Sequence, residues 1–418
     1  MSAETPQTRE RGAVPPAKAG TPRPGAAVSR LPLLAGAMLS VIAGLWGGLS
    51  LLGTGVPVPN PTLATQHGPL MALGFLGTLI SLERAVALGR PWGYAAPALA
   101  GIGALAGAAG FARPGQVLLT AAAGWFLAVY LVLLARRPCR EVVVQMCGAI
   151  AWYIGGLLWL RGLPIADLVP WLMAFLVLTI AGERLELAHV GFLPHQEKGR
   201  RASDGILAAM GVLGAGVVAS VPWPVIGWRV AGLGMVALAG LLSVHDIARR
   251  TVRSTGLPRF AAVCLLSGYA WLTLAGALWA VFGRPETGGL YDASLHAVFL
   301  GFVMSMVFGH APVILPAVLR VRLPYHPMLY GPLALLHAAL LVRIAGDLGG
   351  LPAVRTVGGV LGEVSLLAFA GCAVLSGRLV PTRRTGAAGH TGSARQTGPA
   401  HQAGAVSRPS RSHKMESS

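Results

Sequence analysis

Residues 166–187 read ADLVPWLMAFLVLTIAGERLEL, and every ionisable side chain in this run lies near one of its two ends. An apolar helix of about 20 residues is long enough to span the hydrocarbon core of a bilayer. The apolar residues do not alternate with polar ones, so the run predicts a helix rather than a half-buried strand. Hydrocarbon offers the backbone no hydrogen-bond partners, which also favours a helix.

Eleven further segments of the same kind lie between residues 31 and 377. They run near 31–54, 64–87, 93–111, 115–135, 141–161, 203–222, 224–244, 260–282, 290–318, 327–346 and 352–377. The sequence therefore predicts an all-α, polytopic membrane helix bundle of about twelve transmembrane helices over residues 31–377. Residues 1–30 and 378–418 are poor in apolar residues and rich in Gly, Ser, Pro, Thr and Arg, which predicts disordered tails.

Composition excludes a soluble protein, because 54% of the residues are hydrophobic and only 11% are charged. The net charge of +18 does not indicate nucleic-acid binding, since Lys and Arg lie in the tails and in loops between apolar segments. The loops on the side of both tails carry most of these residues, and the positive-inside rule makes that side cytoplasmic. We expect a multi-pass protein of the cell membrane with both termini in the cytoplasm. The four Cys form no CxxC pair and are expected to be core residues.

Two histidines stand at equal depth on two predicted helices. His67 and His296 each lie about one turn, or roughly 5 Å, inside the outer boundary of a segment that runs inward. Ionisable groups inside a membrane are costly and are therefore functional candidates. Neutral imidazole ligates iron, and a haem held by two histidines needs one from each of two neighbouring helices. A single interfacial histidine that hydrogen-bonds a carbonyl or a headgroup is the alternative reading of each position.

The run His67-Gly68-Pro69-Leu70-Met71 resembles the start of the second helix in haem-copper oxidase large subunits. There, His-Gly-x-x-Met supplies a ligand of the low-spin haem, and the other ligand is the second member of a His-x-His pair that begins the tenth helix. The corresponding positions here are Ser294 and His296. The resemblance implies twelve helices in three pseudo-repeated four-helix units, and a low-spin haem bound by His67 and His296.

The chain also departs from that family. Its sixth and seventh segments lack the histidines that ligate copper, so copper is possible but the usual ligands do not support it, and a functional haem-copper oxygen reductase is not expected. The run from His296 to Met304 is also similar to the NnrS family of haem- and copper-containing membrane proteins linked to nitric oxide. Any haem would be b-type and noncovalent, because CxxCH is absent. The resemblance implies a redox or nitric-oxide-related function, such as electron transfer. It also implies a redox partner protein or a diatomic gas as the binding partner. Whether the protein is an enzyme stays open.

Other polar residues form two further groups. His310 and His337 are candidates for a second metal or proton site, with hydrogen-bonded core histidines as the alternative. The structural candidates are Glu83, Arg84, Glu183 and Arg184, which lie at the inner ends of the second and sixth segments and are expected to form ion pairs between them.

Two other functions are compatible with twelve helices, namely a secondary transporter and a cofactor-free membrane assembly protein. The transporter hypothesis is disfavoured because mid-membrane carboxylates, which commonly couple transport to protons or sodium, are nearly absent from the segments. The loop after the second segment also lacks the motif of the major facilitator group.

Overall fold

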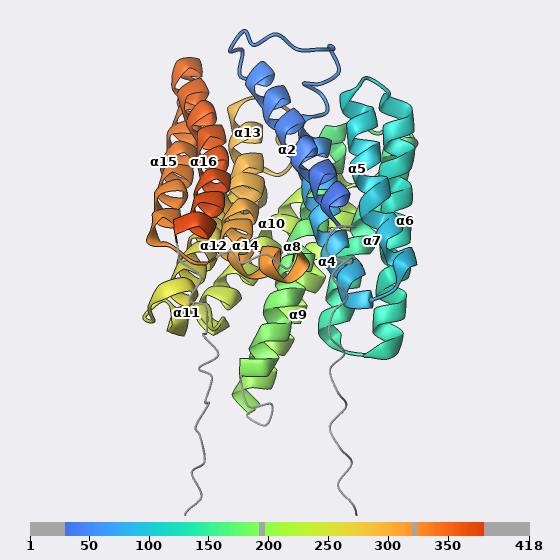
Figure 1. Ribbon diagram of the computed structural model, residues 1–418, viewed down its shortest axis with the longest axis vertical. Coiled ribbons are helices and arrows are strands. Elements are labelled where there is room, and N and C mark those ends of the chain that lie inside the picture. Colours follow the sequence, from blue (N-terminus) through green and yellow to red (C-terminus); the bar gives the residue numbers. More distant parts are fainter. Residues whose placement is uncertain (1–29, 192–196, 320–323, 380–418) are drawn as a thin grey trace, which may run out of the picture. The chain divides into compact units, whose positions relative to one another are not determined.

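The protein is an all-α, multi-pass membrane helix bundle, as the sequence predicts. The computed structural model describes residues 30–191, 197–319 and 324–379, and every regular element in these ranges is a helix. Both predicted tails lie outside these ranges, apart from their residues nearest the bundle. The helices, shown in Figure 1, follow one another as α2 (Leu31–Leu51), α3 (His67–Pro69), η1 (Leu70–Gly77), α4 (Thr78–Leu88), η2 (Pro91–Tyr94), α5 (Ala95–Ala108), α6 (Ala112–Arg136), α7 (Arg140–Leu160), α8 (Ile165–Gly191), α9 (Glu197–Ala219), α10 (Pro224–His245), α11 (Ala248–Thr251), α12 (Gly256–Phe282), α13 (Gly289–His296), η3 (Ala297–Val303), α14 (Met304–Leu319), η4 (Pro327–Leu329), α15 (Tyr330–Leu348) and α16 (Pro352–Leu379).

Eleven helices among the described residues are long and apolar enough to cross a membrane. The remaining predicted segment, 93–111, forms the shorter helix α5 of 14 residues. At about 1.5 Å per residue α5 is only about 21 Å long, and the preceding 3₁₀-helix η2 adds about 8 Å. The expected third span therefore differs from the others because its first turns are wound as a 3₁₀-helix after Pro91.

Helices that follow one another in the chain are mostly packed against each other, as expected for short connections. The pairs α5 with α6, α6 with α7, α7 with α8, α9 with α10, and α15 with α16 make extensive contacts. The two ends of the described chain meet where α2 touches α16, and α13 packs against α15. In Figure 1, α15 and α16 lie beside α13, with α5, α6 and α7 on the other side of α2.

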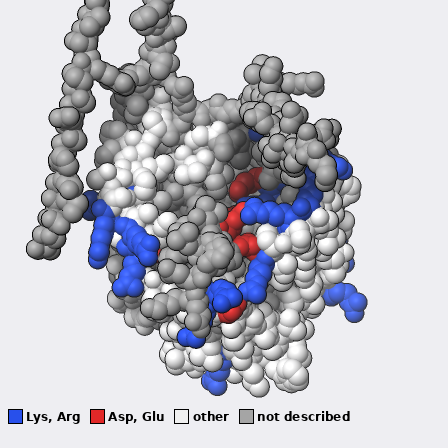
Figure 2. Space-filling model, turned by 90° about the horizontal axis from the view of Figure 1, so that it is seen from below, with Lys and Arg blue, Asp and Glu red and all other residues white. Residues whose placement is uncertain are grey.

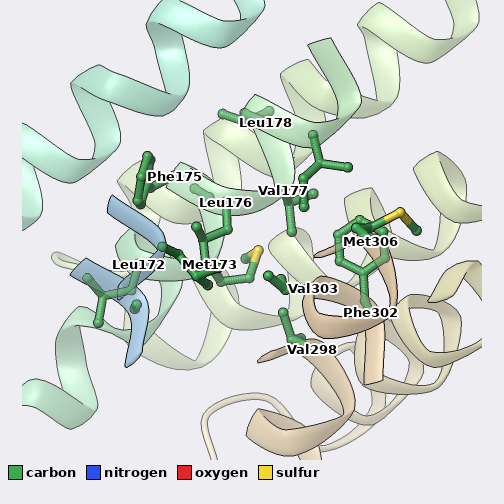
Figure 3. Packing of buried hydrophobic residues seen from close by; sticks show 14 of the residues in the cluster. Leu172, Met173, Phe175, Leu176, Val177, Leu178, Val298, Phe302, Val303 and Met306 are labelled. Carbon is green, nitrogen blue, oxygen red and sulfur yellow. The ribbon is translucent and has the colours of Figure 1, made fainter. Parts of the chain in front are cut away.

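Helix α8 forms the centre of the bundle. Of its most apolar 18 residues, 83% are buried, a larger share than in any of the ten other spanning helices. A helix that is apolar all round is stable only when it is surrounded by other helices or by lipid. Figure 3 shows Met173 and Val177 of α8 directed toward Val298 and Val303 of η3, with Phe302 of η3 and Met306 of α14 close by. This packing holds η3 against α8.

Basic side chains gather at the end of the bundle that carries the α6–α7 connection. Figure 2, seen from this end, shows Lys and Arg around several carboxylates. Exposed arginines here include Arg136, Arg137 and Arg140 before and after that connection, and Arg249 and Arg253 near α11. The opposite ends of the helices carry the residues of the candidate site.

Candidate functional site

A cavity of about 340 Å³ contains both histidines that the sequence singles out. Its wall is formed by side chains of α2, α3, η1, α8, α13, η3, α15 and α16, and most of them are apolar. Cavities that take small molecules and cofactors have this size and this character. The ionisable side chains on the wall are His67, Tyr291, Asp292, His296, Arg343, Arg355 and Glu363.

His67 is held by a backbone carbonyl of a neighbouring helix. Its Nδ1 lies 2.7 Å from the carbonyl oxygen of Gly44 in α2. A carbonyl oxygen only accepts, so Nδ1 carries the proton and donates it. In the neutral ring the lone pair is then on Nε2, the nitrogen free to ligate a metal.

His296 has the same tautomer but a stronger set of partners. Its Nδ1 donates to the carbonyl oxygen of Asp292 at 2.8 Å and lies 3.3 Å from the Oδ1 of the same residue. Arg343 in α15 holds this carboxylate with two side-chain nitrogens, at 2.9 Å from Oδ2 and 3.1 Å from Oδ1. The lone pair of His296 is therefore also on Nε2.

Both histidines lie directly before a π-helical segment. The segment η1 begins three residues after His67, and η3 begins at the residue after His296. A π-helical turn holds one residue more than an α-helical turn, and such turns occur frequently at functional sites. The extra residue rotates the side chains before it relative to those after it. In both helices, the extra residue therefore sets the direction of the histidine side chain relative to the buried apolar residues that follow it.

Glycines of α2 leave room for side chains on the cavity wall. A Cβ atom at Gly44 would lie 2.8 Å from the sulfur of Met71. One at Gly48 would lie 2.9 Å from Oε1 of Glu363 and 3.1 Å from Nδ1 of His67. Real Cβ atoms essentially never approach other atoms to less than 3.0 Å. Glycine at these positions therefore lets Met71, Glu363 and His67 approach α2 closely, and a larger residue would force these side chains to shift.

One face of α16 supplies a part of the site that the sequence analysis missed. Arg355, Gly359, Gly362, Glu363 and Leu366 all line the cavity. They recur at the three- and four-residue spacing of a single helix face. Glu363 interrupts a strongly apolar segment, and a carboxylate in a membrane span is by itself a functional candidate. That signal is present in the sequence and identifies Glu363 without the structure.

His310 and His337 do not line this cavity. Nδ1 of His310 donates to the carbonyl oxygen of Met306 at 2.6 Å, within its own helix. His337 accepts a hydrogen bond at Nδ1 from the indole N–H of Trp271 at 2.9 Å, so its proton is on Nε2. Among the described residues, no group of three or more His, Cys, Asp and Glu is placed to hold a metal ion. The second metal site stays a prediction.

An ion-pair cluster joins α4 and α8 toward the basic end of the bundle. Arg84 lies 2.8 Å from Oε1 of Glu183 and 3.3 Å from Oε1 of Glu83. Arg184, the fourth residue of this predicted group, is 6% exposed, and its Nε makes no hydrogen bond. The cluster lies far along these helices from the histidine cavity, and it ties the two helices together.

Comparison with known protein families matches the same part of the chain that forms the spanning helices. No curated protein matches the sequence significantly. A family model described as Domain of unknown function (DUF8744) matches residues 30–378. Because this match covers well over half of the chain and includes every spanning helix described above, the protein belongs to the family described as domain of unknown function DUF8744.

Proposed function

We propose that the protein is a haem-binding membrane protein in which His67 and His296 are the two axial ligands of one noncovalent, b-type haem. The observation that carries this proposal is that two histidines from separate helices line one cavity. Each donates its Nδ1 proton to a carbonyl oxygen, and each keeps its Nε2 lone pair. Histidines that ligate metals almost always have this arrangement, because the Nδ1 hydrogen bond fixes the tautomer and the ring orientation.

The rest of the wall fits a haem chemically. Its apolar side chains suit the macrocycle, and Arg355 supplies a cation for an acidic substituent. Nε of Arg355 is buried and makes no hydrogen bond among the residues that the structure describes. Bound haem would supply one-electron chemistry, while His67 and His296 hold the iron and the apolar wall excludes water.

We further propose that the basic end of the bundle faces the cytoplasm, as the positive-inside rule requires. The cavity then lies near the outer side of the cell membrane. A haem held by both histidines would supply electron-transfer chemistry, and nitric oxide would compete with a histidine for the iron. The function is therefore electron transfer or nitric-oxide-related redox chemistry, as the resemblance to the NnrS family implies.

One observation favours a second candidate function. Glu363 is a half-buried carboxylate on the wall of a cavity inside the membrane region, and transporters that couple to protons use such groups. A proton-coupled transporter would take up its substrate into vesicles in response to an imposed pH gradient. Loss of this uptake in Glu363→Gln, in a protein without haem, would favour this second candidate.

The proposal is tested by the reduced-minus-oxidised visible spectrum of the purified protein in detergent. We expect a sharp low-spin haem band in the wild type that His67→Ala and His296→Ala each abolish. His326→Ala is the matched control, because His326 lies outside the cavity and its side chain bonds the backbone of Met328. A protein that stays colourless after incubation with haem would refute the proposal.

A further inference from the structure

The two histidines of the cavity are not equivalent in their surroundings. His67 donates to one neutral carbonyl oxygen. His296 donates its Nδ1 proton to the carbonyl oxygen of Asp292 at 2.8 Å, and Oδ1 of the Asp292 carboxylate lies 3.3 Å from the same nitrogen. A carboxylate this close to the imidazole N–H interacts with it electrostatically, and the interaction is stronger where water is largely excluded.

The carboxylate of Asp292 is itself fixed in place. The guanidinium group of Arg343 approaches it side-on, with Nε 2.9 Å from Oδ2 and Nη2 3.1 Å from Oδ1. Only 11% of the Arg343 side chain and 22% of the Asp292 side chain are exposed. A two-point contact of this kind defines orientation as well as distance, which lysine cannot reproduce. The chain Arg343–Asp292–His296 therefore runs from α15 to the cavity.

We infer that Asp292, clamped by Arg343, is a positioning residue for His296 that raises the donor strength of its imidazole and makes His296 the more firmly held of the two ligands. This inference rests on the proposed function. A carboxylate beside Nδ1 shifts electron density in the imidazole toward Nε2 and would stabilise the oxidised, more positively charged iron. Removal of the carboxylate charge also leaves the positive charge of Arg343 uncompensated, which favours the reduced iron. Both effects have the same sign.

The experiment is a spectroelectrochemical titration of the full-length protein, with the haem midpoint potential as the readout. Asp292→Asn keeps the size of the side chain and removes its charge. We expect the ratio of reduced to oxidised haem at a fixed potential to rise at least about tenfold, which is an upward shift of about 59 mV for one electron. Arg343→Lys should shift the potential in the same direction by less, because its positive charge remains while the side-on contact is lost.

Asp167→Asn is the matched control. Asp167 pairs with Arg284 at 2.6 Å near the same ends of the helices, and neither residue lines the cavity. This substitution should leave the potential unchanged. A structural role alone would lower the haem content or the thermal stability without a shift in the potential of the haem that remains.

The outcomes separate the inference from the proposed function. A wild-type protein that binds no haem overturns both. A haem protein in which Asp292→Asn and Arg343→Lys keep the wild-type potential overturns the inference alone. If Asp292→Asn fails to retain haem, the midpoint potential of Arg343→Lys, which keeps the carboxylate, tests the inference: an upward shift supports it and the wild-type potential overturns it.

Discussion

Gly48 offers the most direct structural perturbation of the histidine cavity. A methyl group at this position in α2 would lie 2.9 Å from Oε1 of Glu363 and 3.1 Å from both Nδ1 and Cε1 of His67. Ordinary van der Waals contact begins at 3.4 Å, so these groups have to move by several tenths of an ångström in Gly48→Ala. The Glu363 carboxylate is the end of a flexible side chain and can turn into the cavity. The imidazole of His67 has to shift by only a few tenths of an ångström, and its hydrogen bond to the carbonyl oxygen of Gly44, 2.7 Å long, can lengthen by that amount.

The Gly48→Ala substitution should weaken haem binding more than it destabilises the haem-free protein. In the free protein, the cavity leaves room for Glu363 to turn, whereas bound haem fills that room. Insertion of a methyl group into a packed site costs about 1–3 kcal/mol. This free energy corresponds to haem binding that is weaker by about 5- to 150-fold, since about 1.4 kcal/mol is a factor of ten.

The assay is titration of haem-free protein with haem, followed by the Soret absorbance. Gly36→Ala is the matched control, because it lies on the same helix and its Cβ would meet nothing closer than the Cα of Gly101, at 3.7 Å. Thermal unfolding of both haem-free variants should resemble that of the wild type. If Gly48→Ala binds haem as tightly as Gly36→Ala does, the assignment of the cavity as the haem site is refuted.

Three further predictions concern other parts of the molecule. Arg84→Ala should destabilise the protein by about 3–5 kcal/mol in a denaturation measurement, because it leaves buried carboxylates unpaired; Arg140→Ala breaks a mostly exposed pair and should cost about 0–1 kcal/mol. His310→Ala and His337→Ala should both keep the low-spin haem band, since neither histidine lines the cavity, and loss of the band in either variant would contradict this placement. Arg355→Leu should speed haem transfer to apomyoglobin relative to the wild type, and an unchanged rate would show that Arg355 does not contact the haem.

The helices and the pairing of the two histidines could be predicted from sequence because both depend on local patterns. Apolar runs of sufficient length specify spanning helices, and a position within such a run specifies depth. His67 and His296 were expected at equal depth, and the structure places both on one cavity. The predicted segment 93–111 differs in detail, because the structure divides this part of the chain between the 3₁₀-helix η2 and the 14-residue helix α5.

Contacts between distant helices could not be predicted in this way. Thr356 of α16 bonds the carbonyl oxygen of Leu52, 304 residues earlier in the chain. Periodicity shows which face of a helix is apolar, but not which helix covers it. The pairing of Arg343 with Asp292 on the cavity wall is a contact of this kind, because it joins α15 to α13.

The sequence patterns also do not predict the two π-helical segments. A single inserted residue changes the helical register by about 100°, and the apolar runs of η1 and η3 contain nothing that distinguishes a π-turn from an α-turn. In the structure, the second and tenth predicted segments are alike, because each contains a π-helical segment that follows a histidine.

The central claim is that His67 and His296 hold one haem iron between them. Chemical rescue tests it most directly, because a histidine replaced by glycine leaves a space that free imidazole can occupy. In His67→Gly and in His296→Gly, the low-spin spectrum should disappear and should return when imidazole is added. A low-spin spectrum that persists in either variant without imidazole would contradict the claim, as would a variant that binds haem but that imidazole does not return to the low-spin form.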